Sequence, residues 1–177
     1  MAALTPVTEK FILHWGEMGT RWGVNRTVAQ IHALLYVSGK AMAAEEIAET
    51  LSVARSNVST SLKELQGWGV VRVVHVLGDR RDHFESMKDV WEMFRIVLDE
   101  RKRREIDPTL AVLRDCVAEA ERAGASEKQA KERLSHMLEF FETMSGWYEQ
   151  MRRLPTAAVM RFVRMGGKLQ KLLGLGG

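Results

Sequence analysis

The residues best suited to binding chemistry lie between positions 55 and 63. They combine short hydroxyl and amide groups with two cations: Arg55, Ser56, Asn57, Ser59, Thr60 and Lys63. Such groups can approach base edges and phosphates closely and donate or accept hydrogen bonds there. Serine, threonine and asparagine are only middling helix formers, so their concentration in a helix costs stability. We interpret this run as a DNA-contact face, and the alternative is an ordinary solvated helix face.

A second cationic group follows in the segment GDRRD. Gly78 and Asp79 favour a turn, which puts Arg80 and Arg81 at its tip. Arginine at a projecting tip suits the narrow, negatively charged minor groove of DNA. The alternative is a hairpin whose solvated arginines pair with Asp79 and Asp82.

A short helix is predicted just before the polar run, in AEEIAETL. Its apolar residues recur at spacings of three and four, on one side of a helix. They are Ala44, Ile47, Ala48 and Leu51. Glu45, Glu46 and Glu49 make the outer face acidic. Because that face would repel a phosphate backbone, we expect this helix to support its neighbour and not to enter a groove.

The polar run itself is predicted to lie on a second helix, from Val53 to Gln66, with Ser52 capping it or turning the chain into it. Its apolar stripe consists of Val58, Leu62 and Leu65. Gly67 and Gly69 end this helix, and the β-branched segment VVRVVHV then predicts a strand. The residues from His83 to Met87 return as a second strand. Helix, turn, helix and hairpin together make a winged helix-turn-helix.

The order IAETLSVARSNVSTSLKELQGWGVV followed by GDRRDHFE resembles the MarR superfamily of transcriptional regulators, and more closely its GbsR-like branch. The similarity is most specific over about residues 5 to 105 and general beyond them. It implies a homodimeric, sequence-specific repressor on a pseudo-palindromic operator, relieved by a small ligand. It also implies an Asp and Arg pair in the wing, and Asp79 with either Arg80 or Arg81 matches that pattern. The alternative function is a winged-helix protein-interaction module.

The expected fold class is mainly α with a small β-hairpin, a winged helix-turn-helix lobe plus a helical dimerisation region. We expect an N-terminal dimerisation helix in 1–24, the DNA-binding domain in 25–105 and a C-terminal helical dimerisation or regulatory region in 106–177. The predicted helix limits are Thr5-Pro6 to Gly19 or Gly23, Asn25 to Ser38-Gly39, Lys88 to Arg104, Asp107-Pro108 to about Arg122, and Ser126 to Leu154-Pro155.

Four aromatic residues lie near the junction between the expected lobe and the expected dimer helices: Trp15, Trp22, Tyr36 and Trp91. Aromatic faces can hold a quaternary ammonium by cation-π attraction. Some GbsR-like proteins are associated with choline or glycine betaine sensing, so the resemblance makes these four residues the candidate contacts of a small-molecule effector. Simple core packing is the interpretation that we prefer for them from the sequence.

The sequence gives little evidence for metal binding, catalysis or thiol chemistry. The five histidines lack a metal-binding spacing, and no phosphate-binding lysine loop or serine nucleophile elbow occurs, so we expect no metal, no cofactor and no enzyme. The single cysteine, Cys116, excludes an internal disulfide and is interpreted as a packing residue, with a redox-sensing thiol as the alternative. The net charge of +3 is concentrated in the cations of residues 52 to 81.

No signal peptide or membrane span is visible, so the protein is expected in the cytoplasm, with double-stranded DNA and a second copy of itself as partners and no membrane. The basic run Arg101 to Arg104 could touch phosphates or interact with its own helix dipole. The tail carries four cations and no acid: Arg161, Arg164, Lys168 and Lys171. It is expected to pack in the dimer, and the alternatives are a membrane-surface helix and a mobile tail.

Overall fold

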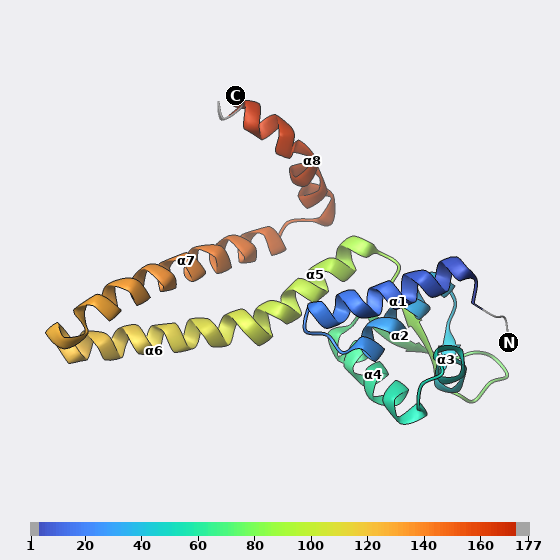
Figure 1. The fold of residues 1–177 in the computed structure, drawn as a ribbon. Helices are drawn as coiled ribbons and strands as arrows, with labels where there is room; N and C mark the ends of the chain where they lie inside the picture. Colours follow the sequence, from blue (N-terminus) through green and yellow to red (C-terminus); the bar gives the residue numbers. More distant parts are fainter. Residues whose placement is uncertain (1–3, 173–177) are drawn as a thin grey trace. The chain divides into compact units, whose positions relative to one another are not determined.

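The computed structural model describes residues 4–172, and the chain divides into two compact units, Met1–Ile96 and Val97–Gly177. It is mainly helical with one small antiparallel sheet, which confirms the predicted fold class (Figure 1). The units are described separately below. The first contains the predicted helix-turn-helix and wing, and the second contains the C-terminal helices.

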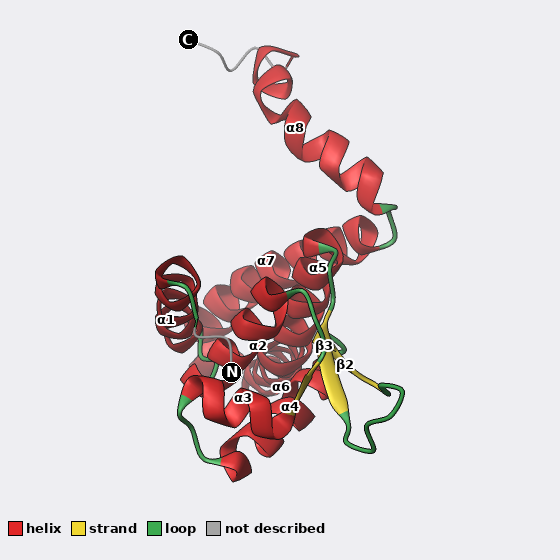
Figure 2. Ribbon diagram, turned by 90° about the vertical axis from the view of Figure 1, so that its right-hand side faces the viewer, coloured by secondary structure: helices red, strands yellow, loops and turns green. Residues whose placement is uncertain are grey.

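The first unit starts with two helices and continues into the helix-turn-helix and the sheet. Its elements are α1 (Pro6–Arg21), α2 (Arg26–Ser38), β1 (Met42–Ala43), α3 (Ala44–Leu51), α4 (Arg55–Trp68), β2 (Val71–Val74), β3 (His83–Ser86) and the start of α5 (Val90–Arg101). The strands are ordered β1-β3-β2 and are antiparallel (Figure 2). Phe84 in the central strand pairs with Met42 on one side and Val73 on the other.

The predicted starts of α1 and α2 are confirmed by their caps. The Thr5 hydroxyl accepts a hydrogen bond from the backbone N–H of Thr8 at 3.2 Å, and the Asn25 side chain accepts one from Thr27 at 2.8 Å. The two helices then pack closely. A Cβ atom added to Gly19 would lie 2.5 Å from the Cβ of Ala29, so the glycine permits this approach.

The core of this unit forms around α2, α3 and α4. Its largest fully buried side chains are Ile31, Leu34, Leu35, Ile47, Val58, Leu62, Leu65 and Val70. The apolar stripe predicted for α4 is therefore buried, and the short acidic helix contributes Ile47. Burying a side chain of this size removes it from water at a gain of roughly 1.5 to 3 kcal/mol. This packing fixes which face of α4 remains outside.

Three local predictions were wrong. Helix α4 begins at Arg55 and not at Val53, because Ser52 has a left-handed backbone (φ 54°) and ends α3. Gly67 lies inside α4, and Gly69 alone ends it, with φ 81°. The sheet also has a third strand, β1, which the sequence analysis did not predict because two residues are too few to show a period.

The second unit consists of helices and connecting turns, with no strand among its described residues. After α5 come a π-helical turn (Lys102–Ile106), α6 (Asp107–Ala123), a short 3₁₀ turn (Gly124–Glu127), α7 (Lys128–Arg152) and α8 (Thr156–Leu172). The predicted end at Arg104 is wrong, since α5 continues through the π turn into α6. Pro108 is tolerated in the first turn of α6, where its missing N–H matters least.

Helices α6 and α7 lie side by side (Figure 1). Their contact buries Leu110, Leu113 and Ala120 of α6, whereas Cys116 is only half-buried. Ion pairs link Arg114 to Glu142 and Lys131 to Glu121 at 2.8 and 2.7 Å.

The tail is described in part. The side chains of Arg164, Lys168 and Lys171 lie outside the described residues. Within residues 4–172, no helix is both long and apolar enough to cross a membrane.

Candidate nucleic-acid interface

The predicted contact face of α4 is exposed. All six of its residues are solvent-accessible: Arg55, Ser56, Asn57, Ser59, Thr60 and Lys63. Helical spacing arranges them in rows, because residues four apart follow one another along a helix. Arg55, Ser59 and Lys63 form one row, and Ser56 and Thr60 form the next. Asn57 lies one helical turn before Ser61, which is buried. Asn57 therefore stands at the edge where the exposed face of α4 meets the rest of the domain.

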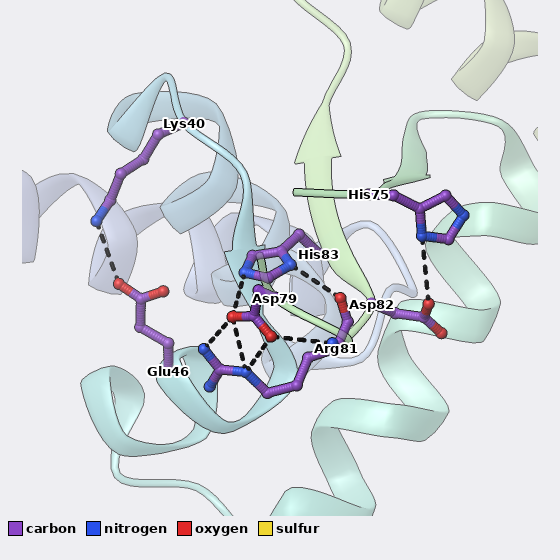
Figure 3. Close-up of polar contacts among 7 residues, drawn as sticks. All are labelled: Lys40, Glu46, His75, Asp79, Arg81, Asp82 and His83. Carbon is purple, nitrogen blue, oxygen red and sulfur yellow. Dashed lines mark hydrogen bonds and ion pairs between the residues drawn. The ribbon is translucent and has the colours of Figure 1, made fainter. Parts of the chain in front are cut away.

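The acidic helix α3 is tied to the start of α4 by an ion pair. The guanidinium of Arg55 lies 2.5 Å from the Glu45 carboxylate, and two-thirds of the Arg55 side chain stays exposed. Glu46 pairs with Lys40 at 3.1 Å (Figure 3). Exposed pairs of this kind add little stability. They do neutralise two of the three carboxylates that sequence analysis expected to repel phosphate.

The wing loop, residues 75–82, is organised around Asp79. The Asp79 N–H donates to the Val76 carbonyl at 3.0 Å, and Gly78 supplies the positive φ (85°) that this turn requires. The Asp79 carboxylate accepts hydrogen bonds from the Arg81 backbone N–H at 3.0 Å and from the Arg81 guanidinium at 2.5 to 3.0 Å (Figure 3). These bonds hold the pKa of the Asp79 carboxyl well below its usual range.

The two wing arginines differ in their surroundings. Arg81 is held by Asp79, and this pairing raises the pKa of Arg81. Arg80 is exposed and forms no ion pair or side-chain hydrogen bond with any residue in 4–172. Asp82 lies 4.0 Å from His75 and does not pair with an arginine in this part of the chain. The alternative interpretation, in which both arginines pair with acids, therefore holds only for Arg81. Arg80 has no such partner in the described part of the chain.

The sequence predicts His83 only as a strand residue, yet its side chain contacts the wing loop. Its side chain is buried, with ring nitrogens 3.5 Å from the Asp79 carboxylate and 3.0 Å from the Arg81 carbonyl oxygen. A polar residue that alternates with apolar neighbours in a strand is normally expected to face solvent. Here the segment DHFES begins inside the loop, at Asp82, so alternation gave no signal for His83.

The four candidate ligand aromatics have different environments. Trp15 and Trp22 are exposed at 40% and 53%, while Tyr36 and Trp91 are half-buried. Trp15 contacts Phe11, and Tyr36 lies near His32, with ring centroids 5.4 and 6.5 Å apart.

A cavity of about 190 Å³ lies beside Tyr36, which is the one candidate among its lining residues. The others are Leu35, Gly39, Lys40, Glu85, Ser86, Met87 and Lys88. Within residues 4–172, no three histidine, cysteine or acidic side chains gather as metal ligands would.

Comparisons with known proteins agree with this geometry. Residues 22–82, which include the α4 face and the wing loop, match the model of the MarR family. The HTH-type transcriptional repressor GbsR of Bacillus subtilis (strain 168) is 22% identical over 149 residues, which cover 80% of this chain and 82% of that protein. A solved structure described as a transcriptional regulator has a TM-score of 0.61 at 23% identity and covers 83% of this chain and 96% of its own, so it shares the fold. Residues 22–82 therefore match the MarR family, and the chain over four-fifths of its length is similar to a GbsR-type transcriptional repressor.

Proposed function

We propose that this protein is a sequence-specific repressor that binds a pseudo-palindromic operator as a homodimer. The observation that carries the proposal is the exposed face of α4, the second helix of the helix-turn-helix. Its small polar side chains form no hydrogen bonds with other residues in 4–172. In such motifs the second helix lies in the major groove, with its first residues at the base edges. Ser56, Asn57, Ser59 and Thr60 would read or flank bases there.

The cations would hold the DNA backbone and the minor groove. Lys63 has no ion-pair partner in the described chain and stands on the row of Arg55, which suits a phosphate contact. Arg81 is preorganised by Asp79, and a side chain already held in its binding conformation loses less entropy on binding. We therefore assign minor-groove insertion to Arg81 and a bordering phosphate contact to Arg80.

The proposal of a dimer is supported by an apolar stripe on α7. Met137, Phe140, Met144 and Trp147 recur at spacings of three and four and are 46 to 60% exposed. A second copy of the chain would cover such a stripe, together with exposed apolar residues of α1 such as Val7 and Leu13. Residues 1–24 and 106–177 are accordingly the proposed dimerisation regions.

The proposal includes relief of repression by a small molecule. Trp15, Trp22, Tyr36 and Trp91 are the proposed contacts, and a quaternary ammonium is the chemical class that their aromatic faces would hold. An effector of this kind regulates only if its affinity differs between the DNA-binding arrangement and another one. Quenching of tryptophan fluorescence by choline or glycine betaine tests this part, and no quenching by either would contradict it.

The DNA-reading part is tested with the triple variant S56A/N57A/T60A. Alanine is a better helix former than the residues it replaces, so α4 is expected to keep its fold. Loss of sequence preference in fluorescence-anisotropy titrations, with weak binding to any duplex retained, is the expected result. If the variant discriminated between duplexes as the wild type does, α4 would not be the reading helix and a protein-interaction module would become the better assignment.

A further inference from the structure

His83 is a buried polar residue at the base of the wing, and its backbone is fixed on both sides. It is the first residue of the central strand β3, where it pairs with Ala43 of β1 and Val74 of β2. Its side chain is 9% exposed and contacts the loop that carries the arginines (Figure 3). The sheet therefore determines where this imidazole can lie.

Both ring nitrogens of His83 face hydrogen-bond acceptors. Nδ1 lies 3.0 Å from the backbone carbonyl oxygen of Arg81, and Nε2 lies 3.5 Å from the Asp79 carboxylate. A carbonyl oxygen and a carboxylate only accept, so each contact requires an N–H on the ring. The neutral imidazole has a single N–H, which the shorter contact places on Nδ1. The imidazolium has two and can donate to both groups.

Asp79 links this histidine to the wing arginine. Its carboxylate contacts His83 and also accepts the hydrogen bonds from Nε and one Nη of Arg81, while Nη1 of Arg81 bonds to no residue in 4–172. The remaining donors of the guanidinium are therefore available to DNA. The order of contacts runs from the sheet through His83 and Asp79 to Arg81.

We propose that His83 is a positioning residue for DNA binding, which holds Asp79 and the wing backbone so that Arg81 is aimed at the minor groove. This inference rests on the proposed function. Other charged groups lie around the cluster: Glu45 and Glu46 of α3 act electrostatically on Arg81, and His75 and Asp82 form a separate contact at 4.0 Å. Each contact of His83 needs an N–H of the imidazole, so loss of the ring should weaken the DNA binding that depends on Arg81.

The geometry is tested first without DNA. Nitrogen-15 NMR of the imidazoles in the free full-length chain reports which ring nitrogens carry hydrogen. A hydrogen on Nδ1 of His83 is expected, because this nitrogen lies 3.0 Å from the Arg81 carbonyl oxygen. An unprotonated Nδ1 would overturn the proposal, because its contact with the Arg81 carbonyl would then be absent.

The role in binding is tested by a double-mutant cycle with H83L and R81Q. Leucine fills a similar volume in the sheet without polar groups, and H83L should weaken operator binding by about tenfold, as expected when one arginine contact is lost. In the R81Q background H83L should add no further loss. An equal loss in both backgrounds would indicate a merely structural role and overturn the proposal, as would no loss at all.

Two further variants guard against a folding artefact. H83Q keeps an N–H donor and should retain more affinity than H83L. H75Q removes a histidine that is 85% exposed on the same hairpin and should bind the operator with the wild-type affinity. Equal losses of affinity in H83Q and H83L would contradict the proposal, because the N–H donor would then make no difference. If the wild type bound no duplex, the proposed function would fail with the DNA role of His83, whereas the NMR result would still decide the geometry.

Discussion

Loss of a phosphate contact weakens binding to every DNA sequence, whereas loss of a base contact changes sequence preference. Lys63 is proposed to make a phosphate contact. Replacing it by glutamine (K63Q) should weaken binding to all duplexes alike and reduce the salt dependence of affinity by about one counterion. Titrations at several salt concentrations measure this slope. K128Q, which removes an exposed lysine from the start of α7, is the matched control and should leave the slope unchanged. A loss confined to particular sequences would instead make Lys63 a base-reading residue.

At this scale the sequence supplied the residue types but not their pairing. The face from Arg55 to Lys63 could be predicted because its composition is unusual for a solvated helix. The difference between Arg80 and Arg81 could not, because it depends on a turn in which Asp79 bonds to the backbone N–H two residues later. The Arg55–Glu45 ion pair escaped prediction for the same reason, since it joins two helices across a turn with a left-handed serine.

A buried histidine joins α2 to β3 and should make stability depend on pH. Burial lowers the pKa of His32 from 6.5 to about 4, and its Nε2 lies 3.3 Å from the Ser86 hydroxyl. Above pH 6.5 the ring is neutral in both states, so no effect is present. As pH falls from there toward 4, the unfolded chain takes up the proton first. The free energy of unfolding should therefore decrease, by about 3 kcal/mol across that window.

Urea denaturation at several pH values between 7 and 4.5 checks this expectation. H32L should flatten the decrease in the free energy of unfolding relative to the wild type. H14L replaces an exposed histidine of α1 and should leave the decrease intact. Parallel curves for H32L and the wild type would show that His32 is not responsible.

Two neighbouring glycines at the end of α4 should respond oppositely to alanine. Gly67 lies inside the helix with open space around it, so G67A should raise the free energy of unfolding by up to about 1 kcal/mol. Gly69 has φ 81° and ends the helix, so G69A should lower it by about 1 kcal/mol. Thermal unfolding of the two variants measures the difference. The same sign for both would contradict the observed end of α4.

Most elements were predictable because they carry local signals. The caps Thr5 and Asn25, the stripe of α4 and the glycine that ends α2 are all read from neighbouring residues. The errors occurred where tertiary context decides. Asp107-Pro108 looks like a helix start, but the π-helical turn before it lets the chain continue. Strand β1 exists only because β3 pairs with it.

The whole molecule is proposed to act as a dimer, and the stripe on α7 provides a test. Phe140 is 60% exposed, so F140E should leave the described contacts of α6 with α7 in place while adding a charge to the stripe. The mass measured by analytical ultracentrifugation should fall from that of a dimer toward that of a monomer. Q150E, which adds the same charge at another exposed position of α7, should remain dimeric. A monomeric wild type would contradict the proposed dimer.

The central claim is sequence-specific recognition by a dimer. The most direct test selects bound fragments from random double-stranded DNA and then titrates the selected fragments at two salt concentrations. We expect an inverted repeat whose half-sites are about one helical turn, 34 to 36 Å, apart, with affinity that falls steeply as salt rises. Fragments with no common sequence, bound weakly and alike, would contradict the account.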